Sequence, residues 1–370
     1  MAAPRPRLDV RAVALDATLW DEPTTGIRLY VQCLHDALGR RGVRVALLGA
    51  RRTGDFPRSV ASRSAYVIGE LPHALERADA PLFHAAGNFN LPLTRVAGKR
   101  LVLTVHDLIP EILPETVSRA YRMQFRLWLG RSVQLADRII CVSEQTRRDL
   151  LSLHKVDAAK VAVVHHGVDH LDRIRPLDRT GAAYLESLAL PKRFILYAGS
   201  LDARKNVSLV LEAMVQLAKR GRRETLVLAG QSWFGADPVQ KRIAQLRAEG
   251  LDVRPLGYLA PSLFYAVMRR AGVFVFPSRY EGFGLPPLEA MRLGVPCIVS
   301  EAGALPEVCG DAARKVSPDD GFALALAIEQ LLEQSAERER LIAAGRARAA
   351  RFTWDACAER TLEVYRDALG

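Results

Sequence analysis

The stretch at residues 273–300, VFVFPSRYEGFGLPPLEAMRLGVPCIVS, decides the fold class of this chain. It opens with an apolar, β-rich run at 273–278 and turns through a loop that contains Gly282 and Gly284. A helical run begins near the two prolines that follow, and a second apolar run closes the stretch at 296–300. A buried strand, a helix and another buried strand in succession are typical of a parallel βαβ unit. The stretch therefore predicts an α/β fold.

The same alternation of short apolar runs and longer helical periods extends over the whole chain. In the first half, strands are expected near 10–15, 43–48, 81–86, 100–105, 138–143 and 161–166. In the second half, they are expected at 193–200, 225–230, 253–259, 273–278 and 296–300. Residues 170–192 lose strand character and indicate a linker with a short helix. We therefore expect two Rossmann-like, doubly wound domains, 1–172 and 173–353, that face a central cleft.

The composition is that of a globular enzyme. The chain has 370 residues, 49% hydrophobic and 25% charged, and no apolar run reaches the ~18 residues that cross a bilayer. The five cysteines are scattered and never in CxxC spacing, so we expect core residues in a reducing compartment and no zinc site. The N-terminal segment lacks the pattern of a signal peptide, which favours a cytoplasmic location.

The net charge of +11 is spread over both halves and includes no short run of Lys and Arg. This distribution argues against a nucleic-acid partner. A mild excess of positive charge suits anionic small substrates or an anionic lipid surface.

Two carboxylates, Glu281 and Glu289, flank the glycine loop of the opening stretch. The glycines let the backbone approach a ligand closely, and Pro286 and Pro287 suit the first positions of a helix. A helix N-terminus is an anion site, so we expect phosphate there. Glu289, placed in the first helical turn, is expected to bind a vicinal diol such as a ribose, and Glu281 the group beyond the phosphates. The alternative is that Glu289 only complements the helix dipole and that Glu281 is a solvated charge in the loop.

A second constellation lies in YAGSLDARKNVSLVLEA, residues 197–213. A strand ends at Gly199, and Arg204 and Lys205 stand just before a helix for which Asn206 is the expected N-cap. An arginine fork beside a lysine point charge is suited to clamp a diphosphate. The alternative is a solvated basic turn.

Three features of the first half also indicate binding. His106 follows a strand in LVLTVHDLIPEILPE and is expected to bond a sugar hydroxyl or move a proton. Gly26 begins the helix that follows the first strand. The segment 118–132 predicts a helix with Arg119, Arg122 and Arg126 on one face and Tyr121, Phe125 and Trp128 on another. Such a helix either lies on an anionic membrane or is an ordinary helix with a solvated face and a core face.

Together these segments resemble glycosyltransferase family 4, the retaining enzymes with the GT-B fold. The carriers are VHDLIPE, ADRIICVSEQTRRDL, HHGVD, AGSLDARKN and EGFGLPPLE, which span nearly the whole chain in the order of the family. The resemblance implies an acceptor held by the first domain, a nucleotide-sugar donor held by the second, no required metal, and a last helix, 354–370, that packs back on the first domain. The chain departs from the family in its single glycine in the first loop and in His166, where Asn is frequent.

The resemblance also implies roles for individual residues. Arg204 and Lys205 would bind the leaving diphosphate, and Glu289 would bind the ribose. The implied catalytic residues are His106, Arg204, Lys205 and Glu281. The implied donor-binding residues lie at strand ends and in the loops that follow them: Gly26, Gly199, Gly230, Tyr258, Leu259, Gly282, Phe283, Gly284, Leu285 and Glu289.

The residues of the motifs GSLDARKN and HDLIPE are similar to those in one branch of the family. That branch contains mannosyltransferases of bacterial surface polysaccharide, including lipopolysaccharide. This similarity favours GDP-mannose as donor over a UDP-hexose, and a saccharide or lipid-linked glycan as acceptor. With a lipid-linked acceptor, the protein is also expected to make a peripheral contact with the cytoplasmic face of a membrane.

The sequence also bears on functions other than glycosyl transfer. A nicotinamide dehydrogenase requires G-x-G-x-x-G in the first βα turn, and the sequence lacks it there. A sugar-nucleotide epimerase of similar two-domain plan and a non-catalytic sugar-nucleotide-binding protein remain as alternatives.

Overall fold

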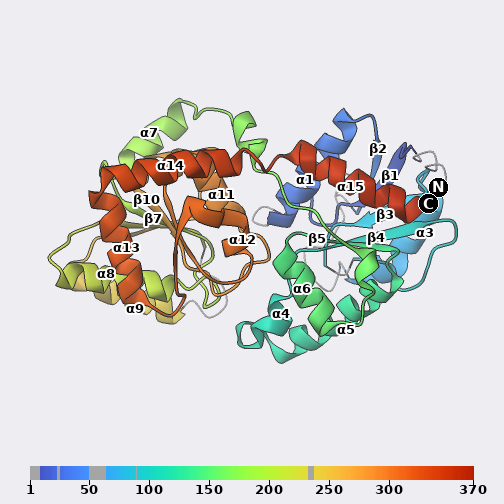
Figure 1. The fold of residues 1–370 in the computed structure, drawn as a ribbon, viewed down its shortest axis with the longest axis horizontal. Helices are drawn as coiled ribbons and strands as arrows, with labels where there is room; N and C mark the ends of the chain where they lie inside the picture. The colour runs from blue at the N-terminus through green and yellow to red at the C-terminus, as the bar shows by residue number, and fades with distance from the viewer. Residues whose placement is uncertain (1–8, 23–25, 50–63, 89, 232–236) are drawn as a thin grey trace, which may run out of the picture. The chain divides into compact units, whose positions relative to one another are not determined.

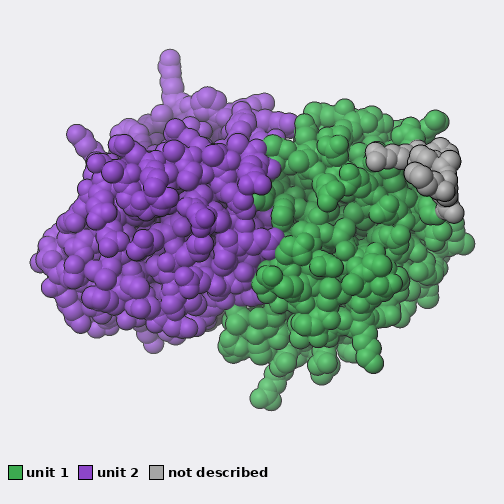
Figure 2. Space-filling model, in the orientation of Figure 1, with its two compact units in different colours: residues 1–167, 352–370 green, residues 168–351 purple. Residues whose placement is uncertain are grey.

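The computed structural model describes residues 9–22, 26–49, 64–88, 90–231 and 237–370. The chain divides into two compact units, each drawn in its own colour in Figure 2. Unit 1 comprises residues 1–167 and 352–370, and unit 2 comprises residues 168–351. Each unit contains a six-stranded sheet whose paired strands are all parallel. The expected α/β fold with two doubly wound sheets is therefore confirmed.

The sheet of unit 1 has the strand order β2-β1-β3-β4-β5-β6. Its strands are β1 (Ala12–Asp16), β2 (Arg44–Leu48), β3 (Leu82–Ala85), β4 (Arg100–Val105), β5 (Arg138–Cys141) and β6 (Val161–Val163). Its helices are α1 (Gly26–Arg40), α3 (Leu71–Arg77), α4 (Ile109–Ile112), α5 (Arg119–Leu135), α6 (Glu144–Leu153) and α15 (Trp354–Leu369). Short 3-10 or π turns are η1 (Tyr66–Glu70), η2 (Pro114–Thr116) and η3 (Ala158–Lys160).

Alternation along β1 assigns its side chains to the two faces of the sheet. Val13 and Leu15 join one apolar cluster, with residues of α1 and α15. Ala12 and Ala14 join the other, with residues of α3 and α5. Figure 1 shows α15 beside α1, so the last helix of the chain covers the same face as the first.

The chain leaves unit 1 and returns to it at one place. A Cβ added at Gly167 would lie 2.2 Å from the backbone nitrogen of Trp354 and 2.5 Å from the carbonyl carbon of Thr353. Only a glycine permits this approach of the outgoing and returning segments.

The sheet of unit 2 has the order β12-β11-β10-β7-β8-β9. Its strands are β7 (Ile195–Ala198), β8 (Leu226–Ala229), β9 (Val253–Gly257), β10 (Val273–Phe276), β11 (Cys297–Ser300) and β12 (Ala313–Val316). Its helices are α7 (Arg179–Ser187), α8 (Val207–Lys219), α9 (Asp237–Ala248), α10 (Pro261–Arg270), α11 (Leu285–Arg292), α12 (Leu305–Cys309), α13 (Gly321–Glu333) and α14 (Ser335–Ala349). Two 3-10 turns are η4 (Asp169–Arg173) and η5 (Gly310–Ala312).

Strand β12 was not expected from the sequence. It is an edge strand with Arg314 exposed and Lys315 half-buried between Ala313 and Val316, which are buried. Two consecutive basic residues hide the apolar signal of so short a strand. The strand core of unit 2 packs against α8 and α13 through apolar side chains such as Val210 and Ile328.

The five cysteines, all in the described ranges, form no disulfide, and all except Cys33 are buried. No helix in the described ranges is both long enough and apolar enough to cross a bilayer.

Candidate functional site

The two sequence motifs of unit 2 meet where its strand order reverses. Strand β7 pairs with β8 on one side and with β10 on the other. The loop with Arg204 and Lys205 follows β7, and the loop with Glu281 follows β10. Because ligands of doubly wound sheets bind beyond the carboxyl ends of the strands at such a switch point, the topology places both loops at the expected ligand site.

A cluster of three charged side chains joins the two loops. Glu281 Oε1 accepts hydrogen bonds from Lys205 Nζ at 2.7 Å and from Arg204 Nη1 at 3.1 Å. The Lys205 ammonium also lies 4.7 Å from the centre of the Phe276 ring at the end of β10, within the range of a cation–π contact. All three charged side chains are largely buried.

The cluster carries two positive charges against one negative charge. Burial raises the pKa of Glu281, but the nearby charges of Lys205 and Arg204 outweigh it and lower the pKa overall, so the carboxylate is ionised. Burial lowers the pKa of Lys205, and Glu281 offsets this only in part because Arg204 adds a like charge. Two cations held side by side in a partly dehydrated place are suited to bind an anion.

The backbone requires glycine at the ends of two strands of unit 2, β7 and β8. Gly199 and Gly230 directly follow β7 and β8 and have φ of +146° and +148°. A Cβ on Gly230 would lie 1.9 Å from the carbonyl oxygen of Gly199, so the two loops approach more closely than a side chain permits.

The glycine loop and the start of α11 lie where the sequence indicated, but the helix start offers few backbone N–H donors. Gly284, with φ of +103°, is the N-cap residue, and Gly282, Phe283 and Gly284 are buried while Leu285 is half-buried. Pro286 and Pro287 occupy the first turn and carry no N–H. The helix end therefore has fewer amide donors than an ordinary N-terminus, and those of Gly284 and Leu285 are the ones to consider.

Glu289 does not lie in the first turn of α11, and that expectation is wrong. It is the fifth residue of the helix, and the first turn holds no acidic residue. Its buried carboxylate accepts a hydrogen bond from Tyr265 Oη at 2.9 Å, and His170 Nε2 lies 3.2 Å from the same oxygen. The carboxylate is thus held by side-chain donors and does not act as a helix-dipole residue.

Asn206 occupies the N-cap position of α8, but its side chain does not cap the helix. The residue has φ of 57°, and its Nδ2 donates to the carbonyls of Pro277 and Pro318. It ties the end of β10 to the loop of the arginine and lysine. Asp202, which the sequence reasoning did not single out, accepts from the Lys205 backbone N–H at 2.9 Å and fixes that loop.

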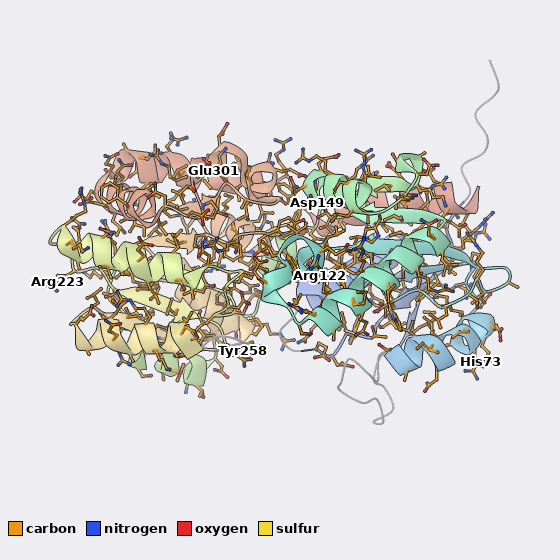
Figure 3. The ribbon with its side chains drawn as sticks, turned by 90° about the horizontal axis from the view of Figure 1, so that it is seen from below. His73, Arg122, Asp149, Arg223, Tyr258 and Glu301 are labelled. Atoms are coloured by element: carbon orange, nitrogen blue, oxygen red, sulfur yellow. The ribbon has the colours of Figure 1, made fainter. Side chains whose placement is uncertain are left out.

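The two residues expected near the base follow β9. Tyr258 is exposed, as Figure 3 shows at the surface of unit 2, and Leu259 is buried. An exposed aromatic ring beside a buried leucine is compatible with stacking on a base, which stays a prediction.

His106 belongs to unit 1, where it follows β4. Burial lowers the pKa of His106 to about 4, so the ring is neutral at neutral pH. Its Nε2 donates to the carbonyl of Ala86 at 2.7 Å, which leaves Nδ1 as the acceptor nitrogen. A neutral ring held in this way can accept a hydrogen bond but is a weak candidate for moving protons.

Strand β1, at the strand-order switch of unit 1, also carries polar residues that the sequence reasoning missed. Asp16 ends β1 and accepts from Asn90 Nδ2 at 2.8 Å and from Thr18 N–H at 3.0 Å. Burial raises the pKa of Asp16 above its usual value. Gly26 is the first residue of α1 and is exposed, whereas residues 23–25 of the same loop lie outside the described residues.

The aromatic face expected on helix α5 is a core face. Phe125 is 1% exposed and Trp128 packs against the same core. The exposed face carries Met123 and Leu127, 59% and 63% exposed, among the arginines of the helix. The segment therefore has a solvated face with two apolar side chains, not three aromatic ones.

Within the described ranges, no three His, Cys, Asp or Glu side chains are grouped so that they could ligate a metal ion.

Comparison with known proteins identifies the family. The model "Glycosyltransferase Family 4" matches residues 24–170, and "Glycosyl transferases group 1" matches 186–348. O-antigen chain mannosyltransferase B of Escherichia coli is 32% identical over 282 residues, which cover 75% of this chain and 72% of the relative. The chain belongs to glycosyltransferase family 4. A second relative, MMP alpha-(1->4)-mannosyltransferase of Mycolicibacterium hassiacum, is 31% identical over 328 residues, which cover 85% of this chain and 75% of the relative.

Solved structures agree on the GT-B fold of this family 4 chain. Sucrose-phosphate synthase of Thermosynechococcus elongatus aligns with a TM-score of 0.74 at 23% identity and covers 96% of this chain and 98% of its own. WaaG, a glycosyltransferase involved in lipopolysaccharide biosynthesis, aligns with a TM-score of 0.70 at 15% identity and covers 95% and 99%. As a family 4 glycosyltransferase, the chain uses a nucleotide-sugar donor and a glycan acceptor.

Proposed function

We propose that this glycosyltransferase moves mannose from GDP-mannose to a saccharide or lipid-linked glycan in the synthesis of a bacterial surface polysaccharide, with retention of configuration and without a metal ion. The names of two relatives, both mannosyltransferases, support the sugar. A UDP-hexose is the other donor to test.

The observation that carries the proposal is the pair of largely buried cations held side by side at the switch point of unit 2. Arg204 and Lys205 both donate to one carboxylate oxygen of Glu281, which fixes the two cations side by side. The diphosphate of a nucleotide sugar is an anion with oxygens that both cations can bind. This arrangement stabilises charge at a fixed place, which is the task that a divalent cation performs in other transferases.

The proposed reaction begins with cleavage of the bond between the anomeric carbon and the phosphate oxygen. The electron pair of that bond stays on the diphosphate, where Arg204 and Lys205 stabilise it, and the sugar acquires oxocarbenium character. The acceptor hydroxyl then forms the new bond on the same face of the ring. Its proton goes to the departing phosphate oxygen, so the atoms balance and no protein base is required.

The test combines binding with product analysis. We expect GDP and GDP-mannose to raise the melting temperature more than UDP, ADP or dTDP and their sugars, because a ligand stabilises the state that binds it. With a lipid-linked or saccharide acceptor, the product must carry an α-linked hexose from the α-linked donor. An epimerised donor without transfer would replace the proposal by the epimerase alternative, and binding without turnover would replace it by a non-catalytic binder.

We propose in addition that α5 contacts an anionic membrane surface. Met123 and Leu127 stand one helical turn apart and are exposed, and with Arg126, Leu153 and Lys155 they line a surface groove. Arg122, labelled in Figure 3, is exposed on the same helix. Exposed apolar side chains among basic ones match the boundary between lipid headgroups and acyl chains. A lipid-linked acceptor would be met there.

A further inference from the structure

Side chains of the described residues hold the carboxylate of Glu289 through one of its two oxygens. Tyr265 Oη donates to Oε1 at 2.9 Å, and His170 Nε2 lies 3.2 Å from the same oxygen. Both hydrogen bonds that described side chains make to this carboxylate therefore end on Oε1. Its second oxygen, Oε2, receives none from the described residues.

Three different elements supply this arrangement. Glu289 lies on α11, Tyr265 on α10 and His170 on η4. The His170 and Tyr265 rings stand edge to face, with centroids 6.4 Å apart, and both residues are largely buried. The histidine is not a chance neighbour of the carboxylate.

A second interaction fixes η4 on α11. Arg292 Nε donates to Asp172 Oδ1 at 3.0 Å, and its Nη2 pairs with Oδ2 of the same carboxylate. The forked pair holds the turn that carries His170 on the helix that carries Glu289. The pair thus helps to fix His170 beside Glu289.

We propose that His170 and Tyr265 are positioning residues for the recognition of the donor ribose. They bind Oε1, select one rotamer of Glu289, and leave Oε2 to accept from the ribose hydroxyls. A carboxylate fixed before binding loses less conformational entropy when the ligand arrives than a mobile one. The inference rests on the proposed function, because it assumes a nucleotide-sugar donor whose ribose reaches Glu289.

The experiment measures discrimination between ribose and its deoxygenated form. The Kd values of GDP and 2′,3′-dideoxy-GDP, and of UDP and 2′,3′-dideoxy-UDP, are determined by calorimetry for the full chain. The wild type is expected to bind the better ribonucleotide about tenfold or more tightly than its dideoxy form, since hydrogen bonds to a charged group are lost. Weaker binding of both forms by a variant would leave this ratio unchanged, so the ratio reports on the ribose contact alone.

Two variants remove the proposed donors. We expect Tyr265→Phe and His170→Leu to reduce the ratio at least about threefold, and His170→Gln, which keeps an N–H, to restore most of it. Tyr184→Phe, at an exposed tyrosine of α7 in the same unit, is the control and must keep the wild-type ratio. Melting curves establish that each variant is folded.

The outcomes separate the two proposals. A wild-type ratio in folded Tyr265→Phe and His170→Leu overturns the positioning role while the proposed donor stands. A wild type that binds GDP or UDP but not in preference to the dideoxy form overturns the ribose role of Glu289 and the positioning role with it. A wild type that binds no nucleotide overturns the proposed function itself.

Discussion

Lys205 Nζ and Glu281 Oε1 lie 2.7 Å apart, although the two residues come from loops after different strands. The pair connects β7 to β10 at the point where the strand order of unit 2 reverses. Because Arg204 binds the same oxygen, the carboxylate orients both cations. A bound anion would therefore meet two cations that are already held side by side.

Replacement of Lys205 by alanine is predicted to abolish most of the transfer activity and leave the fold intact. Removal of one fixed charge from the departing phosphate lowers kcat by about 10²–10³-fold in comparable sites. Steady-state kinetics with GDP-mannose and a saccharide acceptor measures the loss. Lys219→Ala, at an exposed lysine that ends α8, is the matched control. Unchanged turnover in Lys205→Ala would remove the lysine from the diphosphate site.

Nucleotide affinity is predicted to fall at alkaline pH. Burial lowers the pKa of Lys205 below its ordinary 10.5 in the free protein, and a bound diphosphate raises it again. Binding therefore takes up a proton between the two pKa values. Affinity is fully present below the free-state pKa and is lost as pH rises through it, by up to about tenfold per pH unit.

Calorimetry with GDP at a series of pH values from about 7 to 10 measures this dependence. In Lys205→Arg, the guanidinium stays charged over the same interval, so its affinity profile should be flatter. A flat profile for the folded wild type would show that the lysine charge does not contribute to nucleotide binding.

Gly230→Ala is predicted to destabilise unit 2. The added Cβ would meet the Gly199 carbonyl oxygen at 1.9 Å, and φ of +148° strains any residue with a side chain. We expect a loss of about 2–4 kcal/mol in the free energy of unfolding. Gly221→Ala, where φ is +79° but nothing lies within 4 Å of the Cβ, isolates the backbone strain at about 1–2 kcal/mol. Urea denaturation of both variants gives the difference, and equal losses would contradict the predicted clash.

Binding to anionic vesicles is predicted to depend on Met123 and Leu127. Replacement of both by serine removes apolar side chains that are exposed on α5, so fewer molecules should sediment with vesicles that contain phosphatidylglycerol. Replacement of Arg119, Arg122 and Arg126 by glutamine should reduce binding further at low salt and little at high salt. Tyr184→Ser, at an exposed apolar side chain of unit 2, is the control. Equal sedimentation of all variants, or of the wild type with and without anionic lipid, would exclude this surface.

The strands were predictable because most of them are buried on both faces and bounded by glycine or proline. The eleven apolar runs that predict strands in the sequence overlap strands β1 to β11. Strand β12 was missed because Arg314 and Lys315 interrupt its apolar pattern at the edge of the sheet. The orientation of α5 could not be predicted, because helical spacing alone does not show that Phe125 is buried in the core.

The charged residues of the site could be predicted from the sequence, but the residues that hold Glu289 could not. Arg204, Lys205 and Glu281 follow strands in recognisable motifs, and the structure brings them together. Tyr265 and His170 are 24 and 119 residues from Glu289 along the chain, and no local pattern connects them. Their contact depends on how α10, η4 and α11 pack, which only the folded unit determines.

The contact of Gly167 with Trp354 has a consequence for how such enzymes diversify. Since the outgoing and returning segments touch there, residues 168–351 form an insert whose two ends are anchored side by side. Inserts with neighbouring ends can be exchanged between host scaffolds without disturbing them. The half of this chain that we propose to bind the nucleotide is in that sense exchangeable, and chimeras joined at these two points would test which half dictates the sugar that is transferred.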